Sequence, residues 1–129
     1  MVTMKLATAG LISLAFMSAG CEKQVSFRGD VQPILAERCA SCHSPGGMGY
    51  AASGFSVASY ESLMKGTKYA EVIVPGSSLD STLVRLIQHQ ADPSIAMPKS
   101  HQVGKPSEWL TREQIQVITA WIDQGAKNN

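Results

Sequence analysis

The sequence lacks a strong charge of either sign, because its 11 basic and 10 acidic residues nearly cancel. A nucleic-acid-binding protein needs a basic surface that neutralises phosphates, so this balance argues against that class. The chain also lacks the Gly-Lys-Ser/Thr ending of a phosphate-binding loop, although glycines gather at residues 46–54. No pair of alternating segments predicts a β-hairpin. What is present, 129 residues of which 44% are apolar, fits one ordinary globular domain.

The sequence has no apolar run near its start that is long enough to span a bilayer comfortably. The run at residues 6–17 is too short, and it follows the positive charge of Lys5. Small residues come next, at positions 18–20, as before the cleavage site of an export signal. We therefore expect residues 1–20 to be a signal peptide.

Cys21 directly follows this segment and resembles the lipidated cysteine of bacterial lipoproteins, although Ser18 stands where leucine is usual. We expect Cys21 to be diacylated and to anchor the exported protein to the membrane on the periplasmic side. Ordinary cleavage after Gly20 is the alternative, and it would leave a free thiol in an oxidising compartment. The remaining chain divides into a short tether at 21–29 and one domain at 30–127.

The domain carries helical signals at both ends. Asp30 is a good N-cap for a helix that runs into Cys39, with Val31, Ile34 and Leu35 on its apolar face. The last helix is expected to begin at a capping box of Thr111 and Gln114 and to end at Gly125. Its apolar face consists of Ile115, Ile118 and Ile122, with Trp121 at the edge.

Between these helices we expect loops and two shorter helices. Several glycines predict a loop over Pro45–Gly54, and a short helix should run from Ser59 to Lys65 and stop at Gly66 in the left-handed conformation. A turn is expected at 74–76. A further helix should begin near Ser78 and end before Asp92, with Leu79, Leu83, Leu86 and Ile87 on one face. The predicted fold class is all-α, with long loops.

The most specific pattern is the run from Cys39 through Cys42 to His43, which reads Cys-Ala-Ser-Cys-His. Cys-x-x-Cys-His is the attachment sequence for c-type haem. Two cysteines one helical turn apart can each form a thioether with a haem vinyl group. The histidine that follows is then held beneath the iron as the proximal ligand. We therefore predict one covalent haem c at Cys39 and Cys42.

Three other uses of this pattern are less consistent with the sequence. A thioredoxin-type pair requires a βαβ context, whereas this region is expected to be helical. A structural zinc site requires four ligands, and no second close-spaced pair accompanies Cys39 and Cys42. A plain disulfide between them would leave His43 without a role.

Several residues could supply the sixth iron ligand. Met97 precedes Pro98 in a loop far from His43, and its soft, neutral thioether would favour ferrous iron. Met48 follows His43 too closely to reach the opposite haem face. The other candidates are Met64, which suits a core role, His89, expected at a helix end, and His101, the main rival of Met97.

Taken together, the motifs resemble a class I c-type cytochrome domain, and more narrowly its planctomycete-type branch. The resemblance extends from about Phe27 to Ala126. The segments that carry it are 30–35, the haem motif at 39–43, 74–77, 83–87, Met97-Pro98, 110–115 and 121–126.

The resemblance implies a haem crevice framed by the first and last helices, which cross each other. His43 would be the proximal ligand and Met97 the distal one. Relatives of the mitochondrial type have a glycine where this chain has Val31 and an aromatic residue where it has Leu35. The crossing is therefore expected to be wider, with Trp121 filling the gap.

Trp109 has two possible roles. Its indole N–H could donate to a haem propionate, as aromatics near the crevice do in this family. It could equally anchor the last helix, since a buried tryptophan seeks a partner for its N–H.

The expected function is electron transfer by a monohaem, His/Met-ligated cytochrome in the periplasm, without enzymatic turnover. Its partners would be a protein donor and a protein acceptor; no nucleic acid and no small-molecule substrate are indicated. One alternative is a haem-based ligand sensor, and another is a peroxidase-like protein, both of which need an open iron site. The domain could also be the electron-input module of a larger oxidoreductase complex.

Overall fold

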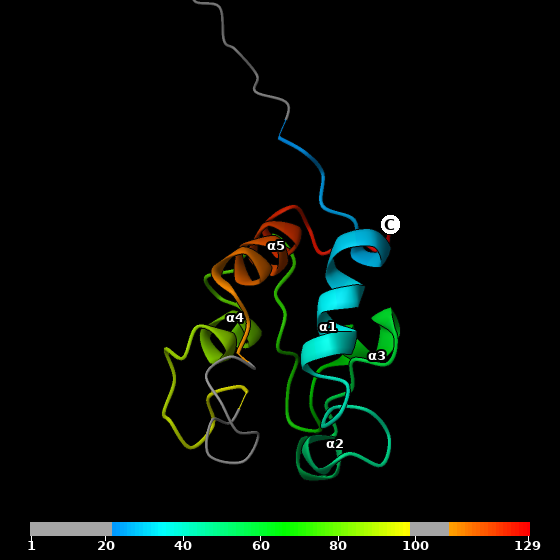
Figure 1. Cartoon of the computed structure of the whole chain (residues 1–129), viewed down its shortest axis with the longest axis vertical. Coiled ribbons are helices and arrows are strands. Elements are labelled where there is room, and N and C mark those ends of the chain that lie inside the picture. Colours follow the sequence, from blue (N-terminus) through cyan, green and yellow to red (C-terminus); the bar gives the residue numbers. More distant parts are fainter. Residues whose placement is uncertain (1–21, 99–108) are drawn as a thin grey trace, which may run out of the picture.

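The computed structural model describes residues 22–98 and 109–129, and within those ranges it is helical (Figure 1). It has five α-helices, one short π-helix and no strand there, only an isolated bridge between Val74 and Ser77. The predicted all-α class is confirmed. None of the helices in this described part is long and apolar enough to cross a membrane. The predicted signal peptide, Cys21 and His101 lie outside the described residues.

The first helical segment begins earlier than predicted. It consists of the π-helix η1 (Phe27–Val31) followed by α1 (Gln32–Arg38), and its N-cap is Ser26 rather than Asp30. The hydroxyl of Ser26 accepts from the N–H of Gly29 at 3.1 Å, and the N–H of Ser26 donates to the carboxylate of Asp30 at 2.8 Å. Asp30 therefore lies inside the helical segment, where its side chain completes a reciprocal pair of capping hydrogen bonds with Ser26.

The predicted loop at Pro45–Gly54 is wrong, because it contains the helix α2 (Met48–Ser53). Glycine is unfavourable in a helix by roughly 1 kcal/mol relative to alanine, which is why the sequence favoured a loop. The helix is tied to its surroundings: the N–H of Tyr50 donates to the carbonyl of Cys42 at 2.9 Å. Gly54 ends it in the left-handed region, at a φ of 74°.

The middle helices follow the prediction in part. Helix α3 (Tyr60–Lys65) begins where it was predicted, at a capping box of Ser59 and Ser62. The predicted left-handed conformation of Gly66 is wrong, because this residue takes φ 79° and ψ −143°, outside the left-handed helical region. Helix α4 (Thr82–Ile87) begins later than expected, after the buried N-cap Ser81. Leu79 therefore lies in the preceding turn and is 85% exposed, so its predicted place on the apolar face is wrong.

Helix α5 (Arg112–Asp123) has the predicted capping box of Thr111 and Gln114. Gly125 follows it with a φ of 100°, as expected of a residue that ends a helix. Trp121 is only 1% exposed, so it lies within the core rather than at the edge of the helix face.

The core joins the two ends of the chain. Helix α5 packs against η1, where the ring of Trp121 lies 5.4 Å from that of Phe27. Tyr60 of α3 meets Phe27 edge-on at 5.2 Å and donates its hydroxyl proton to the carbonyl of Ala126 at 2.8 Å. This aromatic cluster fixes η1, α3 and α5 relative to one another; α1 continues from η1, and the cysteine motif follows directly from α1.

Candidate haem site

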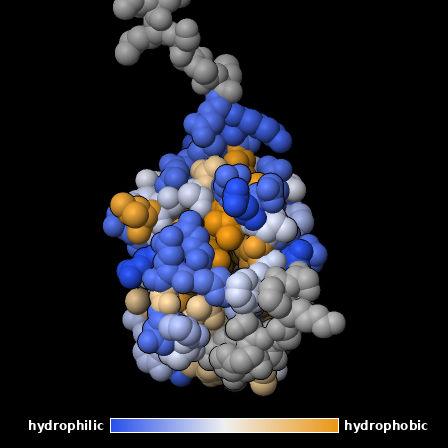
Figure 2. Space-filling model, turned by 60° about the vertical axis from the view of Figure 1, so that its left-hand side comes forward, coloured by the Kyte–Doolittle hydropathy of each residue, from blue (hydrophilic) through white to orange (hydrophobic). Residues whose placement is uncertain are grey.

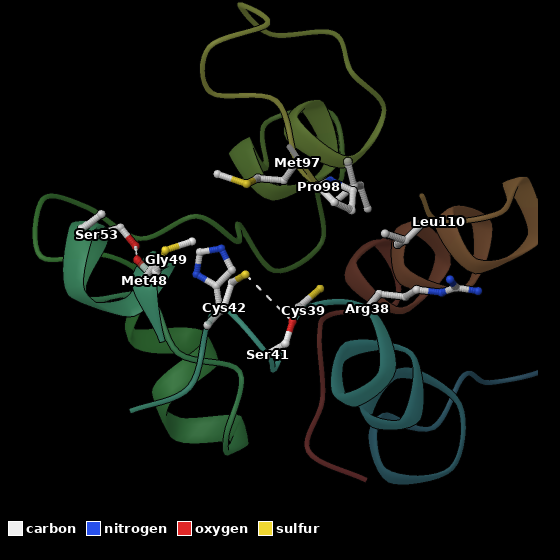
Figure 3. Close-up of a pocket in the computed structure, with 13 residues that line it drawn as sticks. Arg38, Cys39, Ser41, Cys42, Met48, Gly49, Ser53, Met97, Pro98 and Leu110 are labelled. Carbon is white, nitrogen blue, oxygen red and sulfur yellow. Dashed lines mark hydrogen bonds between the residues drawn. The ribbon is translucent and has the colours of Figure 1, made fainter. Parts of the chain in front are cut away.

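A cavity of about 380 Å³ lies beyond the C-terminal end of α1. Its volume is within the usual range for small-molecule and cofactor sites. One wall comes from the cysteine motif and α2, and the other from α4 and the segment after it (Figure 3). Figure 2 shows apolar residues gathered in a hollow between hydrophilic walls on one face. The described lining consists of Arg38, Cys39, Ser41, Cys42, His43, Met48, Gly49, Ala52, Ser53, Ile87, Met97, Pro98 and Leu110.

The two cysteines lie on one turn at the end of α1. The N–H of Cys39 donates to the carbonyl of Leu35 at 2.9 Å, and the carbonyl of Cys39 accepts from the N–H of His43 at 2.8 Å. Both thiols are free and half-buried. Burial raises the pKa of the Cys39 thiol to about 11, with a further rise from Cys42 and a partial offset by Arg38. No disulfide joins the two thiols in this structure.

A hydrogen bond at one ring nitrogen orients His43 and leaves the other ring nitrogen free to bind a metal. Its Nδ1 lies 3.4 Å from the carbonyl oxygen of Phe55, to which an Nδ1–H donates, and the Phe55 ring meets it edge-on at 5.3 Å. A hydrogen bond at one nitrogen fixes the tautomer, so Nε2 presents a lone pair. Burial lowers the pKa of His43, and the bond to Phe55 opposes this only in part. The imidazole is therefore neutral at neutral pH, the form that binds a metal.

Gly49 allows the imidazole to lie against α2, and sequence reasoning missed it. A Cβ at this position would lie 2.6 Å from Cε1 of His43 and 2.9 Å from each ring nitrogen. Real side chains do not make such contacts, so only glycine permits this ring position. The signal that could have revealed it is a glycine inside a short helix, where it is costly unless something needs the space.

Met97 lies on the other wall of the cavity. Its N–H donates to the carbonyl of Leu86 at 3.1 Å, so the end of α4 holds this segment. In Figure 3 its side chain lies across the cavity from Cys39 and Cys42. The structure therefore brings the predicted distal residue to the same cavity as the cysteine motif.

Three of the rival ligands lie in the described residues. Met48 also lines the cavity but is 70% exposed, and it adjoins Gly49, so it lies on the His43 side. Met64 packs against the core from α3. His89 is not among the described residues that line the cavity.

Arg38 is a further cavity residue whose role the sequence did not indicate. Its Nε is buried and has no hydrogen-bond partner among the described residues, while its terminal nitrogen lies 3.4 Å from a carboxylate oxygen of Glu37. A buried guanidinium donor beside the cavity suits a ligand that carries carboxylates. Haem has two propionates, so this feature fits the cofactor that the thiols and the imidazole indicate.

Trp109 lies outside the described lining of the cavity and stacks on His89, with ring centroids 4.2 Å apart. Nε1 of Trp109 and Nε2 of His89 are both buried without a hydrogen-bond partner among the described residues. An unpartnered buried donor is expensive, because it loses its hydrogen bonds to water. The propionate contact of Trp109 stays a prediction, and the anchoring role has the stacking contact in its favour.

Among the described residues, no three histidine, cysteine or acidic side chains come together as a possible metal cluster. The site consists instead of two thiols on one turn, an imidazole with a free Nε2 and a thioether on the facing wall. These are the attachment and ligand groups of a c-type cytochrome.

Comparison with known proteins identifies the branch. Residues 39–101 match the family model described as Planctomycete cytochrome C. This match supports a planctomycete-type cytochrome c domain and a c-type haem protein.

One curated relative is hydrazine synthase subunit alpha of Kuenenia stuttgartiensis. It is 28% identical over 129 residues, an alignment that covers 82% of this chain and 16% of that subunit. The chain thus spans less than a fifth of the relative's length. No solved structure matches the chain.

Proposed function

We propose that the protein is a monohaem electron carrier of the periplasm, anchored to the membrane through lipidated Cys21. The observation that carries this proposal is the placing of Cys39, Cys42 and His43 on one wall of a cavity and Met97 on the other. Its partners are a protein donor and a protein acceptor. We propose neither a nucleic-acid partner nor a small-molecule substrate.

Each residue of the site has a distinct task in this function. Haem c supplies an iron that cycles between the ferric and ferrous states. Cys39 and Cys42 would hold the cofactor covalently, and the bond from Nδ1 to the carbonyl of Phe55 would leave Nε2 of His43 free to bind its iron. Ile87, Pro98 and Leu110 give the cavity an apolar wall that limits water. Low polarity around the site and the neutral Met97 thioether both favour the ferrous state.

The optical spectrum of the haem-loaded protein tests this function. We expect a low-spin ferric spectrum with the weak far-red band of sulfur bound to iron, and one haem per chain by mass spectrometry. We also expect the reduced protein to resist carbon monoxide, because Met97 fills the sixth position. A high-spin ferric spectrum with ready carbon monoxide binding would instead favour the ligand-sensor or peroxidase-like alternatives.

A second candidate is an electron-input module of a larger oxidoreductase complex. The similarity to a protein named as a synthase subunit favours it, because the matched region is only 16% of that subunit. Size-exclusion chromatography of the protein from its native membranes separates the two functions. A free carrier elutes near the mass of one small domain, whereas a module elutes with its complex.

The two roles of Trp109 differ in what its N–H contributes. In Trp109→Phe the ring can still stack on His89, but the donor is lost. If the N–H binds a propionate, the reduction potential shifts while the melting temperature changes little. If Trp109 only anchors α5, the potential is unchanged, and Trp109→Ala alone destabilises the fold, by about 3 kcal/mol. Voltammetry and thermal melting of both variants decide between the roles.

A further inference from the structure

The segment just after Cys21 is hydrogen-bonded to two amide side chains, Gln124 at the end of α5 and Asn129 further along the chain. The N–H of Val25 donates to Oε1 of Gln124 at 2.7 Å, and Nε2 of Gln124 donates to the carbonyl of Lys23 at 3.2 Å. The N–H of Phe27 donates to Oδ1 of Asn129 at 2.9 Å, and Nδ2 of Asn129 donates to the carbonyl of Val25 at 3.3 Å. We call this set of contacts the terminal clasp.

The terminal clasp lies at the opposite end of the domain from α2 and the cysteine motif. In Figure 1 residues 22–26 leave the body beside the start of η1 and the C-terminal end of the chain, while α2 lies at the far end. The helical segment from Phe27 to Arg38 separates the clasp from the cavity, and at 1.5 Å per residue this is about 16 Å.

Only a short length of chain separates the clasp from the expected lipid anchor at Cys21. Lys23 is its first residue, so only Glu22 separates it from Cys21. Two residue steps span roughly 7 Å even when fully extended. A lipid chain on Cys21 would therefore hold this end of the domain against the bilayer surface.

The charged side chains at this end are of both signs. Lys23, Arg28 and Lys127 are exposed there, as are Glu22 and Asp123, and Asp30 is half-buried and accepts from the N–H of Ser26. Basic side chains at a membrane surface are attracted to anionic lipids, but here three carboxylates balance them. The orientation therefore rests on the short tether and the terminal clasp.

We propose that the terminal clasp orients the anchored domain, with the starts of η1 and α1 and the end of α5 on the membrane and the haem cavity turned toward water. This inference rests on the proposed lipidation of Cys21. Its redox partner is then a water-soluble protein that approaches from the aqueous side, not a site embedded in the bilayer.

Energy transfer from labelled lipids to haem tests the orientation. The lipidated, haem-loaded protein is reconstituted into phosphatidylglycerol-containing vesicles with a fluorophore on the outer headgroups, which the haem quenches at short range. We expect weak quenching by the wild type and a several-fold increase for Gln124→Ala/Asn129→Ala, whose domain can tilt. Gln116→Ala, an exposed amide on the same helix, should behave as the wild type.

A second variant frees the domain without altering its contacts. An eight-residue Gly-Ser spacer inserted between Cys21 and Glu22 has a root-mean-square length of about 16 Å, enough for the domain to turn over. It should raise quenching even if the double variant proves unstable. Equal quenching by the wild type and the spacer variant would overturn the orientation.

Vesicle flotation separates the inference from the function on which it builds. If the protein does not float with the vesicles, Cys21 is not lipidated and the inference fails. The spectrum of the same sample still reports whether the electron-carrier site is formed, so the two proposals can fail separately.

Discussion

Alanine in place of Gly49 is expected to destabilise the haem-loaded protein, although alanine is normally the better helix residue. Helix propensity alone would stabilise α2 by about 1 kcal/mol. The new Cβ, however, would lie 2.6 Å from Cε1 of His43, so the ring or the helix must move. Such overpacking costs roughly 1–3 kcal/mol, and it displaces the proximal ligand as well. We expect a lower melting temperature together with a weakened low-spin spectrum.

The control for this substitution is Gly29→Ala in η1. A Cβ there meets only the side chain of Ser26, at 3.4 Å, which is an ordinary contact. We expect this variant to keep the spectrum and to be at least as stable as the wild type, because helix propensity favours alanine and no clash opposes it. If Gly49→Ala instead raises the melting temperature and leaves the spectrum intact, the ring of His43 does not lie where the structure places it.

Replacement of Met97 by alanine should have the largest effect on electron transfer. The far-red sulfur band should disappear, and the reduced protein should bind carbon monoxide, because no other sulfur reaches that wall of the cavity in the described residues. Loss of the thioether should also lower the reduction potential, by roughly 0.2 V within the range of about 0.8 V that axial ligands control. Absorption spectroscopy and voltammetry measure the two effects.

Met48→Ala is the matched control, since Met48 lines the same cavity from the His43 side. Its loss should leave the sulfur band in place. If the band persists in Met97→Ala, the sixth ligand is another residue. His101 would be tested next, because its imidazole is the main rival that the sequence offers.

Features set by local rules could be predicted from the sequence. The capping boxes at Thr111 and Ser59 satisfy backbone donors within one turn, so their residues mark helix starts wherever they occur. The cysteine motif likewise carries its chemistry within five consecutive residues. For this reason the all-α class was predicted correctly and the cysteine motif could be singled out.

Features set by contacts between distant segments could not be predicted in this way. Helix α2 exists despite its glycine, because its backbone bonds to Cys42 and its Gly49 accommodates His43. Leu79 has the spacing of a helix face, but the cap at Ser81 starts the helix after it. Arg38 lines the cavity because α4 and Met97 form the wall opposite the end of α1. This arrangement joins distant segments, so no local sequence pattern predicts it.

The attachment of Met97 to the end of α4 has a consequence for how the molecule opens. Among the described residues, the hydrophobic core that joins η1, α3 and α5 includes none between Ile87 and Leu110, and Met97 itself is held through one backbone bond to Leu86. Parts of a protein with few buried contacts can open without global unfolding. The two proposed iron ligands, His43 and Met97, therefore belong to units of different local stability, so mild denaturant should first release the Met97 sulfur while the half that carries Cys39 and Cys42 remains folded.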